Sequence, residues 1–405
     1  MLLKLKSIGC MIFCGSQTIG NIEAGFSPDR ILEISDQILE NNALHFAKNY
    51  PNIPIILPSE WENDDYLLKL KKEDYDLFYG NCPCSGLSQI SRSASVDNPT
   101  NVHFYRTFNA IKKIEPKVFF IENAPTLINT GYPIILDMVK QFKEKYNFTV
   151  IRDKAGNHNV CMQRTRTFLI GWRKDIFKDS IPLLEMNLQP QMTVKKILQD
   201  IYHIPEGSNE LKNHTVLPYR EFSTHDDLLY LVPQGSNCLN SFIDNWSSIK
   251  DKFNEQEAKG IEKSMKKLAA GGRLWNKTPA RPCEDGVAPS MASVVQLIHP
   301  IHNRQFTIRE YARLMGYPDS FEFFPNECKT ETVQCIAQGV PVNFIKYIHL
   351  EIYEALNNNR QLLKEKSKLL NFQHHIKKQY QLFSLEELEQ LNKLDVIKKA
   401  PKLKK

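Results

Sequence analysis

The stretch DLFYGNCPCSGLS, residues 76–88, decides the fold of this chain. Residues 76–80 form a short apolar run, and a turn-forming segment with two cysteines follows it at once. A run of this length, bounded by glycine and proline, is typical of a buried β-strand. A second run, KVFFI at residues 117–121, ends in the same way at Glu122. Ligands of open α/β sheets bind outside the carboxyl ends of the strands, so we expect the cysteines and Glu122 to share one crevice.

More short apolar runs lie on both sides of these two. They occupy residues 9–13, 30–34, 53–57, 148–151 and 167–172. Helix-like stretches, with apolar residues at three- and four-residue spacing, separate several of them at residues 35–49, 105–114 and 134–146. This alternation favours an α/β fold with a doubly wound, mostly parallel, Rossmann-like sheet.

The alternation stops after Arg173. The region that follows is more polar and has prolines at positions 182, 190, 205, 218 and 233. We therefore expect a first domain at residues 1–175, a second, smaller domain at 176–329, and a C-terminal segment at 330–405 that packs back on the first domain.

The segment beyond Arg360 is rich in lysine. Its apolar residues keep a helical spacing at Leu362, Leu363, Leu369, Leu370 and Phe372. We therefore predict an amphipathic helix there, followed by a basic tail.

The composition narrows the class of protein. The 405 residues are 42% hydrophobic, which is typical of a globular protein, and the net charge of +6 suits a polyanionic partner without requiring one. The nine cysteines lack the dense spacing of a disulfide framework, which indicates a reducing, cytoplasmic location. No stretch approaches the ~18 apolar residues that a membrane span needs, so we expect no membrane association.

Six segments form an ordered series of motifs. They are residues 12–26, 80–88, 122–125, 163–171, 309–319 and 337–342. In this order they resemble the motifs of DNA cytosine-5 methyltransferases, and REYARLMGYPD at 309–319 is close to the family's late signature over its whole length. The resemblance covers most of the chain except residues 174–280 and the tail. It implies a divergent prokaryotic member of the restriction–modification type, either the modification partner of a restriction system or a solitary relative.

The resemblance assigns four catalytic residues. CPC at residues 82–84 looks like the family's Pro-Cys loop, which makes Cys84 the nucleophile that adds to cytosine C6. Glu122 is the acid held near N3 of the base. Arg164 and Arg166 match the family's Arg-x-Arg strand and would supply positive charge near the base carbonyl and the thiolate. This chemistry requires a cytosine that is flipped out of the duplex.

The resemblance also implies S-adenosylmethionine as the cofactor. Glu33, at the end of the second predicted strand, fits the carboxylate that binds the ribose hydroxyls. The expected contacts are Phe13, Gly15, Glu33, Ile34, Pro83, Gln338 and Val340. The family's glycine loop appears here as FCGSQT, residues 13–18, and has two glycines fewer, which marks the chain as divergent.

Duplex DNA is the partner that the resemblance implies. Residues 1–175 would be the catalytic, cofactor-binding domain and residues 176–329 a target-recognition domain that reads the major groove. A monomer is expected, with a cognate restriction endonuclease as a functional partner.

Other functions are less consistent with the sequence. A tRNA methyltransferase of the same fold would carry a Cys-Phe-Thr element, which this chain lacks. The altered glycine loop favours a DNA-binding relative that is catalytically impaired, but the intact Cys84, Glu122 and Arg166 argue against it. A nicotinamide-dependent dehydrogenase would need Gly-x-Gly-x-x-Gly after the first strand. No metal site is expected, because the cysteine pairs 10/14 and 82/84 lack a second pair at zinc-finger spacing.

Overall fold

The chain folds into two compact units. The computed structural model describes residues 5–33, 43–83, 86–87, 95–216, 225–272, 279–291, 297–324, 330–364, 368–374 and 379–393. Unit 1 comprises Met1–Asn159, Arg164–Pro190 and Gly339–Lys405, and unit 2 comprises Val160–Gln163 and Gln191–Gln338.

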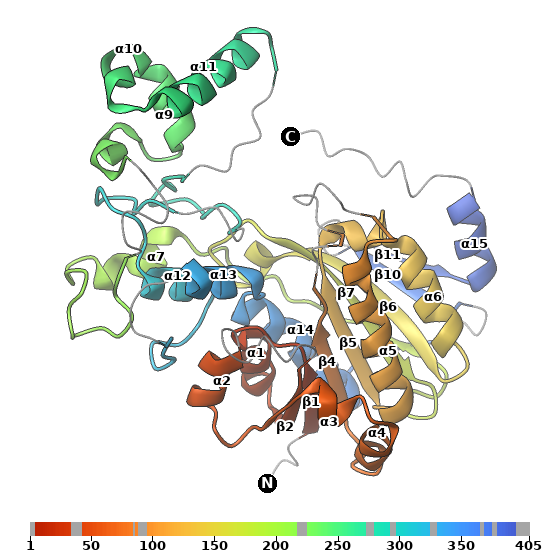
Figure 1. Ribbon diagram of the computed structural model, residues 1–405. Helices are drawn as coiled ribbons and strands as arrows, with labels where there is room; N and C mark the ends of the chain where they lie inside the picture. The colour runs from red at the N-terminus through yellow and green to blue at the C-terminus, as the bar shows by residue number, and fades with distance from the viewer. Residues whose placement is uncertain are drawn as a thin grey trace. The chain divides into compact units, whose positions relative to one another are not determined.

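Within the described residues, unit 1 is built on a nine-stranded sheet with the order β11-β10-β6-β7-β5-β4-β1-β2-β3 (Figure 1). The strands are β1 (Leu5–Cys10), β2 (Phe26–Leu32), β3 (Ile55–Ile56), β4 (Leu77–Asn81), β5 (Val118–Asn123), β6 (Tyr146–Lys154), β7 (Thr165–Arg173), β10 (Leu370–His374) and β11 (Gln379–Phe383). Strand β7 runs antiparallel between β5 and β6, β11 is antiparallel to β10, and the other pairs are parallel. This confirms the predicted α/β class and the mostly parallel sheet.

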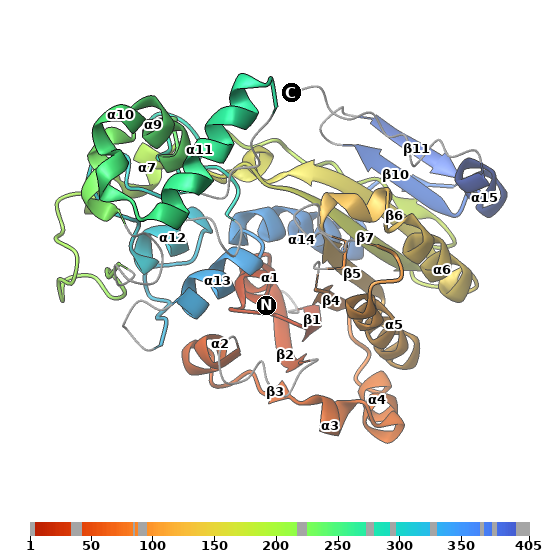
Figure 2. The same cartoon turned by 45° about the horizontal axis from the view of Figure 1, so that its top comes forward.

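Helices cover both faces of this sheet (Figure 2). Those of unit 1 are α1 (Ser16–Glu23), α2 (Ala43–Asn49), α3 (Pro58–Trp61), α4 (Asp64–Lys71), α5 (Val102–Ile114), α6 (Tyr132–Phe142), α14 (Val342–Leu356) and α15 (Leu385–Lys393). Short 3₁₀ helices η2 (Pro99–Asn101), η3 (Pro125–Ile128) and η4 (Ala155–His158) join them. Helices α5 and α6 bury apolar faces against β5 and β6 in one large core, to which Phe108, Phe119 and Phe142 contribute.

Helix α1 follows β1 directly and packs closely on α14. A Cβ atom on Gly20 would lie 2.7 Å from the Val342 carbonyl oxygen, so only glycine permits this approach. Beneath the helices, Ser7 Oγ donates to Asn21 Oδ1 at 2.7 Å, and Asn21 Nδ2 lies 3.0 Å from His349 Nδ1. These buried polar contacts fix the helix that follows the β1 turn to the sheet and to α14.

The C-terminal segment forms strands instead of the predicted helix: β9 belongs to a separate two-stranded sheet, and β10 and β11 extend the large sheet. Leu362 and Leu363 form strand β9, which pairs with β8 (Ile181–Pro182), while Leu370 and Phe372 belong to β10. The helix prediction is wrong because the exposed edge of β6 offers backbone groups for pairing, and Leu370 lies opposite Phe148 in that ladder. Leu370 and Phe372 share one face at a two-residue spacing and contact the large core.

Unit 2 is mostly helical. Its helices are α7 (Val194–Leu198), α9 (Cys238–Asp244), α10 (Trp246–Ile249), α11 (Glu255–Ala269), α12 (Ile308–Leu314) and α13 (Thr330–Gln338), with 3₁₀ helices η5 (Gln199–Ile201), η6 (Asp226–Leu231) and η7 (Lys250–Lys252). Its described residues pair only through isolated bridges, such as Met162 with Ala288. Across the described part of the chain, no helix is long and apolar enough to cross a membrane.

The late signature at residues 309–319 builds the interior of unit 2. Thr307 and Glu310 form a capping box at the start of α12. Arg309 is fully buried, and its guanidinium donates to the carbonyls of Lys212 at 3.0 Å and Phe321 at 2.8 Å. This motif therefore holds the unit together from within.

The bounds of the units differ from the predicted domain bounds. Residues 176–190 fall in unit 1, because β8 pairs with β9 and the Gln189 amide donates to the Asn157 carbonyl at 2.8 Å. Residues 160–163 fall in unit 2, where the Gln163 amide donates to the Ala288 carbonyl at 2.9 Å. Helix α13 also belongs to unit 2 and packs on α12.

Candidate functional site

The two strands that carry the decisive motifs are neighbours. Strands β4 and β5 are parallel, and Asn81 pairs in register with Glu122. The segments that follow them therefore leave the same edge of the sheet. Cys84, the predicted nucleophile, lies outside the described residues, which include Pro83 on one side and Gly86 on the other.

Polar side chains at the end of β5 and just after it bind the backbone of Cys82 and Leu87. The Asn123 amide donates to the Cys82 carbonyl at 3.0 Å, and the Ala124 backbone N–H donates to Asn123 Oδ1 at 2.9 Å. The Thr126 hydroxyl donates to the Leu87 carbonyl. Cys82 and Leu87, which flank residue 84 in the sequence, are thus both tied to the end of β5. Asn123 and Thr126 were not among the predicted site residues, although both follow closely on a predicted strand, which is a signal for a positioning role.

Gly86 lets the returning chain pass close to Asn101. A Cβ atom at Gly86 would lie 2.3 Å from Asn101 Oδ1, which leaves no room for a larger residue. The Asn101 amide donates to the carbonyls of Ser95 at 2.9 Å and Val96 at 2.8 Å, and the Ser95 N–H donates to the Gly86 carbonyl at 2.9 Å. Gly86 is thereby anchored to residues 95–101.

Cys82 faces the interior. Its side chain is 1% exposed and its sulfur lies 3.4 Å from Thr107 Oγ1. Burial raises the pKa of this thiol to about 12. A thiol in this state is protonated near neutral pH and is a poor nucleophile.

Glu122 and Arg166 form a nearly buried ion pair. Arg166 Nε lies 2.8 Å from Glu122 Oε1, and the glutamate side chain is only 3% exposed. Arg164 directly precedes β7 and is buried, and its carbonyl accepts the Ala155 N–H at 2.7 Å. Burial raises the pKa of Glu122 above its ordinary range, against the opposing charges of Arg166 and Arg164. Glu122 is therefore a carboxyl that keeps its proton to a higher pH than usual.

A second buried pair stabilises the turn that leads into Arg164. Asp153 Oδ2 lies 2.7 Å from His158 Nε2, and both side chains are fully buried. Asp153 is the ladder partner of Arg166, and the His158 ring stacks on Phe344 at 4.9 Å. The sequence analysis did not find this pair, because an Asp and a His five residues apart carry no recognisable signal without the turn between them.

The loop after β1 has the backbone of a ligand-binding turn. Phe13 has φ 48° and Gly15 has φ 87°. A Cβ atom on Gly15 would lie 2.2 Å from the Phe46 ring. At the start of α1, Ser16 Oγ and Gln17 Oε1 are buried and have no hydrogen-bond partner within the described residues. These groups offer polar contacts to a bound molecule.

Glu33 directly follows β2, which is the strand next to β1, and its side chain is 1% exposed. Its backbone is fixed on both sides, since its N–H donates to the Ile56 carbonyl at 2.9 Å and its carbonyl accepts Trp61 Nε1–H at 2.5 Å. Together with the loop after β1, this carboxylate fits an adenosyl cofactor, whose ribose hydroxyls need an acceptor at this position. The adjacent Ile34 lies outside the described residues.

The remaining predicted cofactor contacts are dispersed along the chain. Pro83 is partly exposed at the exit of β4. Gln338 is exposed at the last position of α13 in unit 2, whereas Val340 is buried in unit 1.

Comparison with curated proteins found Type II methyltransferases. The chain is 26% identical over 341 residues to the Type II methyltransferase M.DdeI of Desulfomicrobium norvegicum, which covers 76% of this chain and 78% of the relative. It is 26% identical over 357 residues to M.Sau96I of Staphylococcus aureus, which covers 85% of this chain and 74% of the relative. It is 24% identical over 362 residues to M.NgoPII of Neisseria gonorrhoeae, which covers 87% of this chain and 96% of the relative.

Comparison with solved structures supports the fold. A putative DNA modification methyltransferase encoded within a prophage of E. coli superposes with a TM-score of 0.60 at 21% identity, over 87% of this chain and all of that one. The Dnmt2 methyltransferase of S. pombe superposes with a TM-score of 0.52 at 14% identity, over 88% of this chain and all of that one. The family model for C-5 cytosine-specific DNA methylases matches residues 12–354. The chain therefore belongs to the C-5 cytosine-specific DNA methylase family.

Proposed function

We propose that Cys84, Glu122, Arg164 and Arg166 are the catalytic residues of this DNA cytosine-5 methyltransferase. As a member of its family, the chain transfers a methyl group from S-adenosylmethionine to C5 of cytosine in DNA. The observation that carries the residue assignment is the buried Glu122–Arg166 pair, which lies at the end of the strand adjacent to the cysteine segment.

In the proposed reaction, the Cys84 thiolate forms a bond to C6 of a flipped-out cytosine. The electron pair of the C5–C6 double bond shifts toward N3, where Glu122 donates its proton and so stabilises the developing charge. C5 becomes nucleophilic, and a methyl donor held beside it would transfer its methyl group there; S-adenosylmethionine would supply that group and leave as S-adenosylhomocysteine. A base then removes the C5 proton, the N3 proton returns to Glu122, and the C6–S bond breaks to restore the thiolate.

The arginines have two tasks in this scheme. Arg166 holds the Glu122 carboxyl in place through its Nε, 2.8 Å away. Both guanidiniums add positive charge at the edge of the sheet where the cysteine segment emerges, and that charge favours the thiolate form of Cys84.

We assign the cofactor to the turn after β1 and the end of β2. Phe13 and Gly15 would shape the turn and Glu33 would accept the ribose hydroxyls, as the positive φ of Gly15 and the buried Glu33 carboxylate suggest. The assignment extends to Ile34, Pro83, Gln338 and Val340 by their place in the family motifs.

The DNA substrate is double-stranded in this proposal. Unit 2 would act as the target-recognition domain, and the names of the relatives suggest a functional pairing with a restriction endonuclease. A monomer is the proposed state of the enzyme.

The test is bisulfite sequencing of DNA incubated with the full chain and S-adenosylmethionine. We expect protected cytosines within one short duplex sequence, and none with Cys84→Ala. Protection that persists in Cys84→Ala would overturn the assignment of the nucleophile. Protection of tRNA with none in duplex DNA would overturn the substrate, and binding to DNA without transfer would overturn the catalytic assignment.

A further inference from the structure

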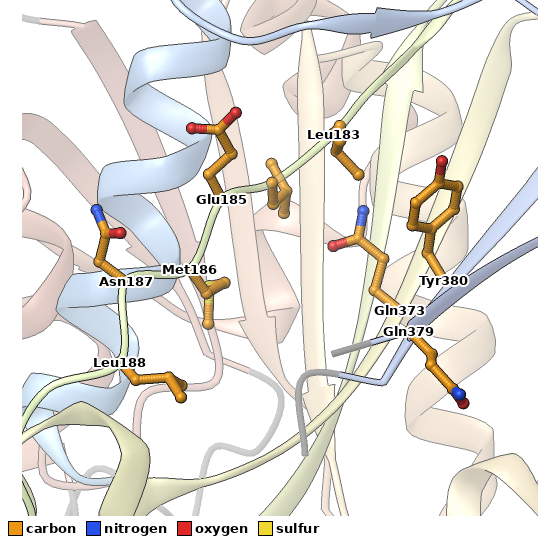
Figure 3. Close-up of a pocket in the computed structure, with 9 residues that line it drawn as sticks. Leu183, Glu185, Met186, Asn187, Leu188, Gln373, Gln379 and Tyr380 are labelled. Carbon is orange, nitrogen blue, oxygen red and sulfur yellow. The ribbon is translucent and has the colours of Figure 1, made fainter. Parts of the chain in front are cut away.

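Unit 1 contains a cavity of about 410 Å³, and none of the proposed catalytic or cofactor residues that the structure describes lines it. It lies between residues 183–188, which follow β8, and strands β10 and β11 (Figure 3). Its volume is within the range of small-molecule sites. Glu122 on β5 pairs in register with Phe168 on β7, and Phe168 pairs with Ile151 on β6. Ile151 in turn pairs with Gln373 on β10, which lines the cavity. At ~4.8 Å per strand, the backbones of Glu122 and Gln373 are about 14 Å apart.

The wall formed by residues 183–188 is fixed in place. The Leu183 N–H donates to the Gln361 carbonyl at 2.9 Å, next to the β8–β9 pair. The Glu185 N–H donates to Glu351 Oε2 at 2.8 Å, and that carboxylate is ion-paired with Arg360 Nε at 2.7 Å. A ligand would therefore meet a preformed surface, which reduces the entropic cost of binding.

Gln373 points to what the cavity binds. Its side chain is 2% exposed, yet neither Oε1 nor Nε2 has a hydrogen-bond partner within the described residues. Leaving a buried polar group unsatisfied costs about 1–3 kcal/mol, so such groups call for an explanation. Figure 3 shows the Gln373 amide beside the Tyr380 ring, opposite residues 183–188. The two residues are register partners on one face of the β10–β11 ladder.

The lining defines the chemistry of a partner. A glutamine amide pairs with a planar edge that presents one donor beside one acceptor, as adenine does. Tyr380 is 51% exposed and offers an aromatic face on which a base can stack. Leu183 and Met186 supply apolar contacts on the other side. Glu185 is the one charged residue among the described lining, and its negative charge disfavours a phosphate.

We propose that this cavity is a second ligand site, separate from the catalytic site, which binds an uncharged adenine nucleoside. The Gln373 amide pairs with the 6-amino group and the adjacent ring nitrogen of the base. The Tyr380 ring stacks on the base, and the sugar faces the open side of the cavity.

The experiment is isothermal titration calorimetry of adenosine into the full chain, with S-adenosylhomocysteine present at saturation to fill the cofactor site. We expect one adenosine per chain. Gln373→Leu should weaken binding at least about tenfold, and Tyr380→Leu about fivefold. Purine riboside, which lacks the 6-amino donor, and AMP, which adds a phosphate, should each bind about tenfold more weakly than adenosine.

Gln373→Leu also reports on folding. Because the substitution removes two unpartnered buried polar atoms, the melting temperature of the Gln373→Leu variant should equal or exceed that of the wild type. The matched control is Gln141→Leu on α6, an exposed glutamine that should leave adenosine binding unchanged. Absence of adenosine binding at millimolar concentration overturns the proposal, as does equal binding by wild type and Gln373→Leu or equal binding of AMP and adenosine. A Glu33→Ala variant that loses methylation but keeps this binding separates the inference from the proposed function.

Discussion

At the scale of single residues, the site depends on how burial sets the protonation of Glu122 and Cys82. The sequence was sufficient to predict that a carboxylate and a cysteine segment would share one edge of the sheet, because each follows an apolar run directly. It could not predict that Asn123 ties the two together or that Asp153 meets His158. The Asn123 contact depends on two strands that become neighbours only in the folded sheet, and the Asp153–His158 contact depends on the local turn between β6 and η4.

The raised pKa of Glu122 leads to a prediction about the pH dependence of methylation. Glu122 donates a proton in the proposed reaction, so the single-turnover rate should fall as the pH rises through that raised pKa and the donor is lost. Glu122→Gln should lower the rate by about 10²–10⁴-fold and abolish this alkaline limb. The measurement is the rate of methyl transfer to a duplex substrate between pH 6 and 10. If the rate of the Glu122→Gln variant still falls at high pH, the group that titrates is not Glu122.

The burial of Cys82 leads to a prediction about covalent trapping. A duplex with 5-fluorocytosine at the target position should form an adduct that survives denaturing electrophoresis, since the C5 fluorine cannot be removed as a proton is. Cys82→Ala should still form this adduct, because the Cys82 thiol is 1% exposed and its pKa is raised to about 12. Cys84→Ala should form none. An adduct that disappears with Cys82→Ala would move the nucleophile to Cys82.

At the scale of elements, the predicted strands near β1, β4, β5 and β7 are present because short apolar runs between breakers have few alternatives in an α/β chain. The tail was misassigned for a physical reason. Leu369, Leu370 and Phe372 satisfy a helical and an alternating pattern about equally, and the free edge of β6 decides between them. Sequence periodicity contains no information about such an edge.

The link between the ends of β4 and β5 can be tested at this scale. Asn123→Ala removes the donor to the Cys82 carbonyl and should cost about 1–3 kcal/mol of unfolding free energy. Because the cysteine segment is then held less firmly, we expect the single-turnover rate to fall about tenfold while KM for DNA stays the same. The matched control is Asn147→Ala on β6, a buried asparagine that donates to Asp179 at 3.2 Å. It should lose similar stability but keep its rate, and an equal loss of rate in both variants would contradict a positioning role for Asn123.

At the scale of the whole molecule, the sequence indicated two parts but not where one ends. Four residues, Val160–Gln163, belong to unit 2 although they lie between β6 and β7 of unit 1. Their place is set by backbone hydrogen bonds with Ala288, more than a hundred residues away in sequence. Local composition cannot predict that these four residues belong to unit 2, because their partner is so distant in the sequence.

Each unit contains a buried, neutral histidine, and this predicts how the whole molecule responds to acid. Burial lowers the pKa of His349 in unit 1 to about 3, and burial together with Arg304 lowers the pKa of His299 in unit 2 to about 2. Below pH 6.5 a histidine in the unfolded chain binds a proton, whereas the buried histidine in the folded chain does not. The free energy of unfolding therefore decreases as the pH falls. Stability should therefore be fully present above pH 6.5 and decline toward pH 3.

Urea denaturation at pH 7.5 and at pH 5 measures this loss, and two variants assign it to the units. His349→Gln keeps an acceptor for Asn21 but does not titrate, so it should lose less stability on acidification than the wild type, and only in the transition of unit 1. His299→Gln should act in the same way on the transition of unit 2, where the ring accepts the Ile301 and His302 N–H groups. If acidification destabilises both variants as much as the wild type, the histidines are not the groups that take up the protons. If each variant alters both transitions equally, the two units unfold as one and the division of the chain has no thermodynamic counterpart.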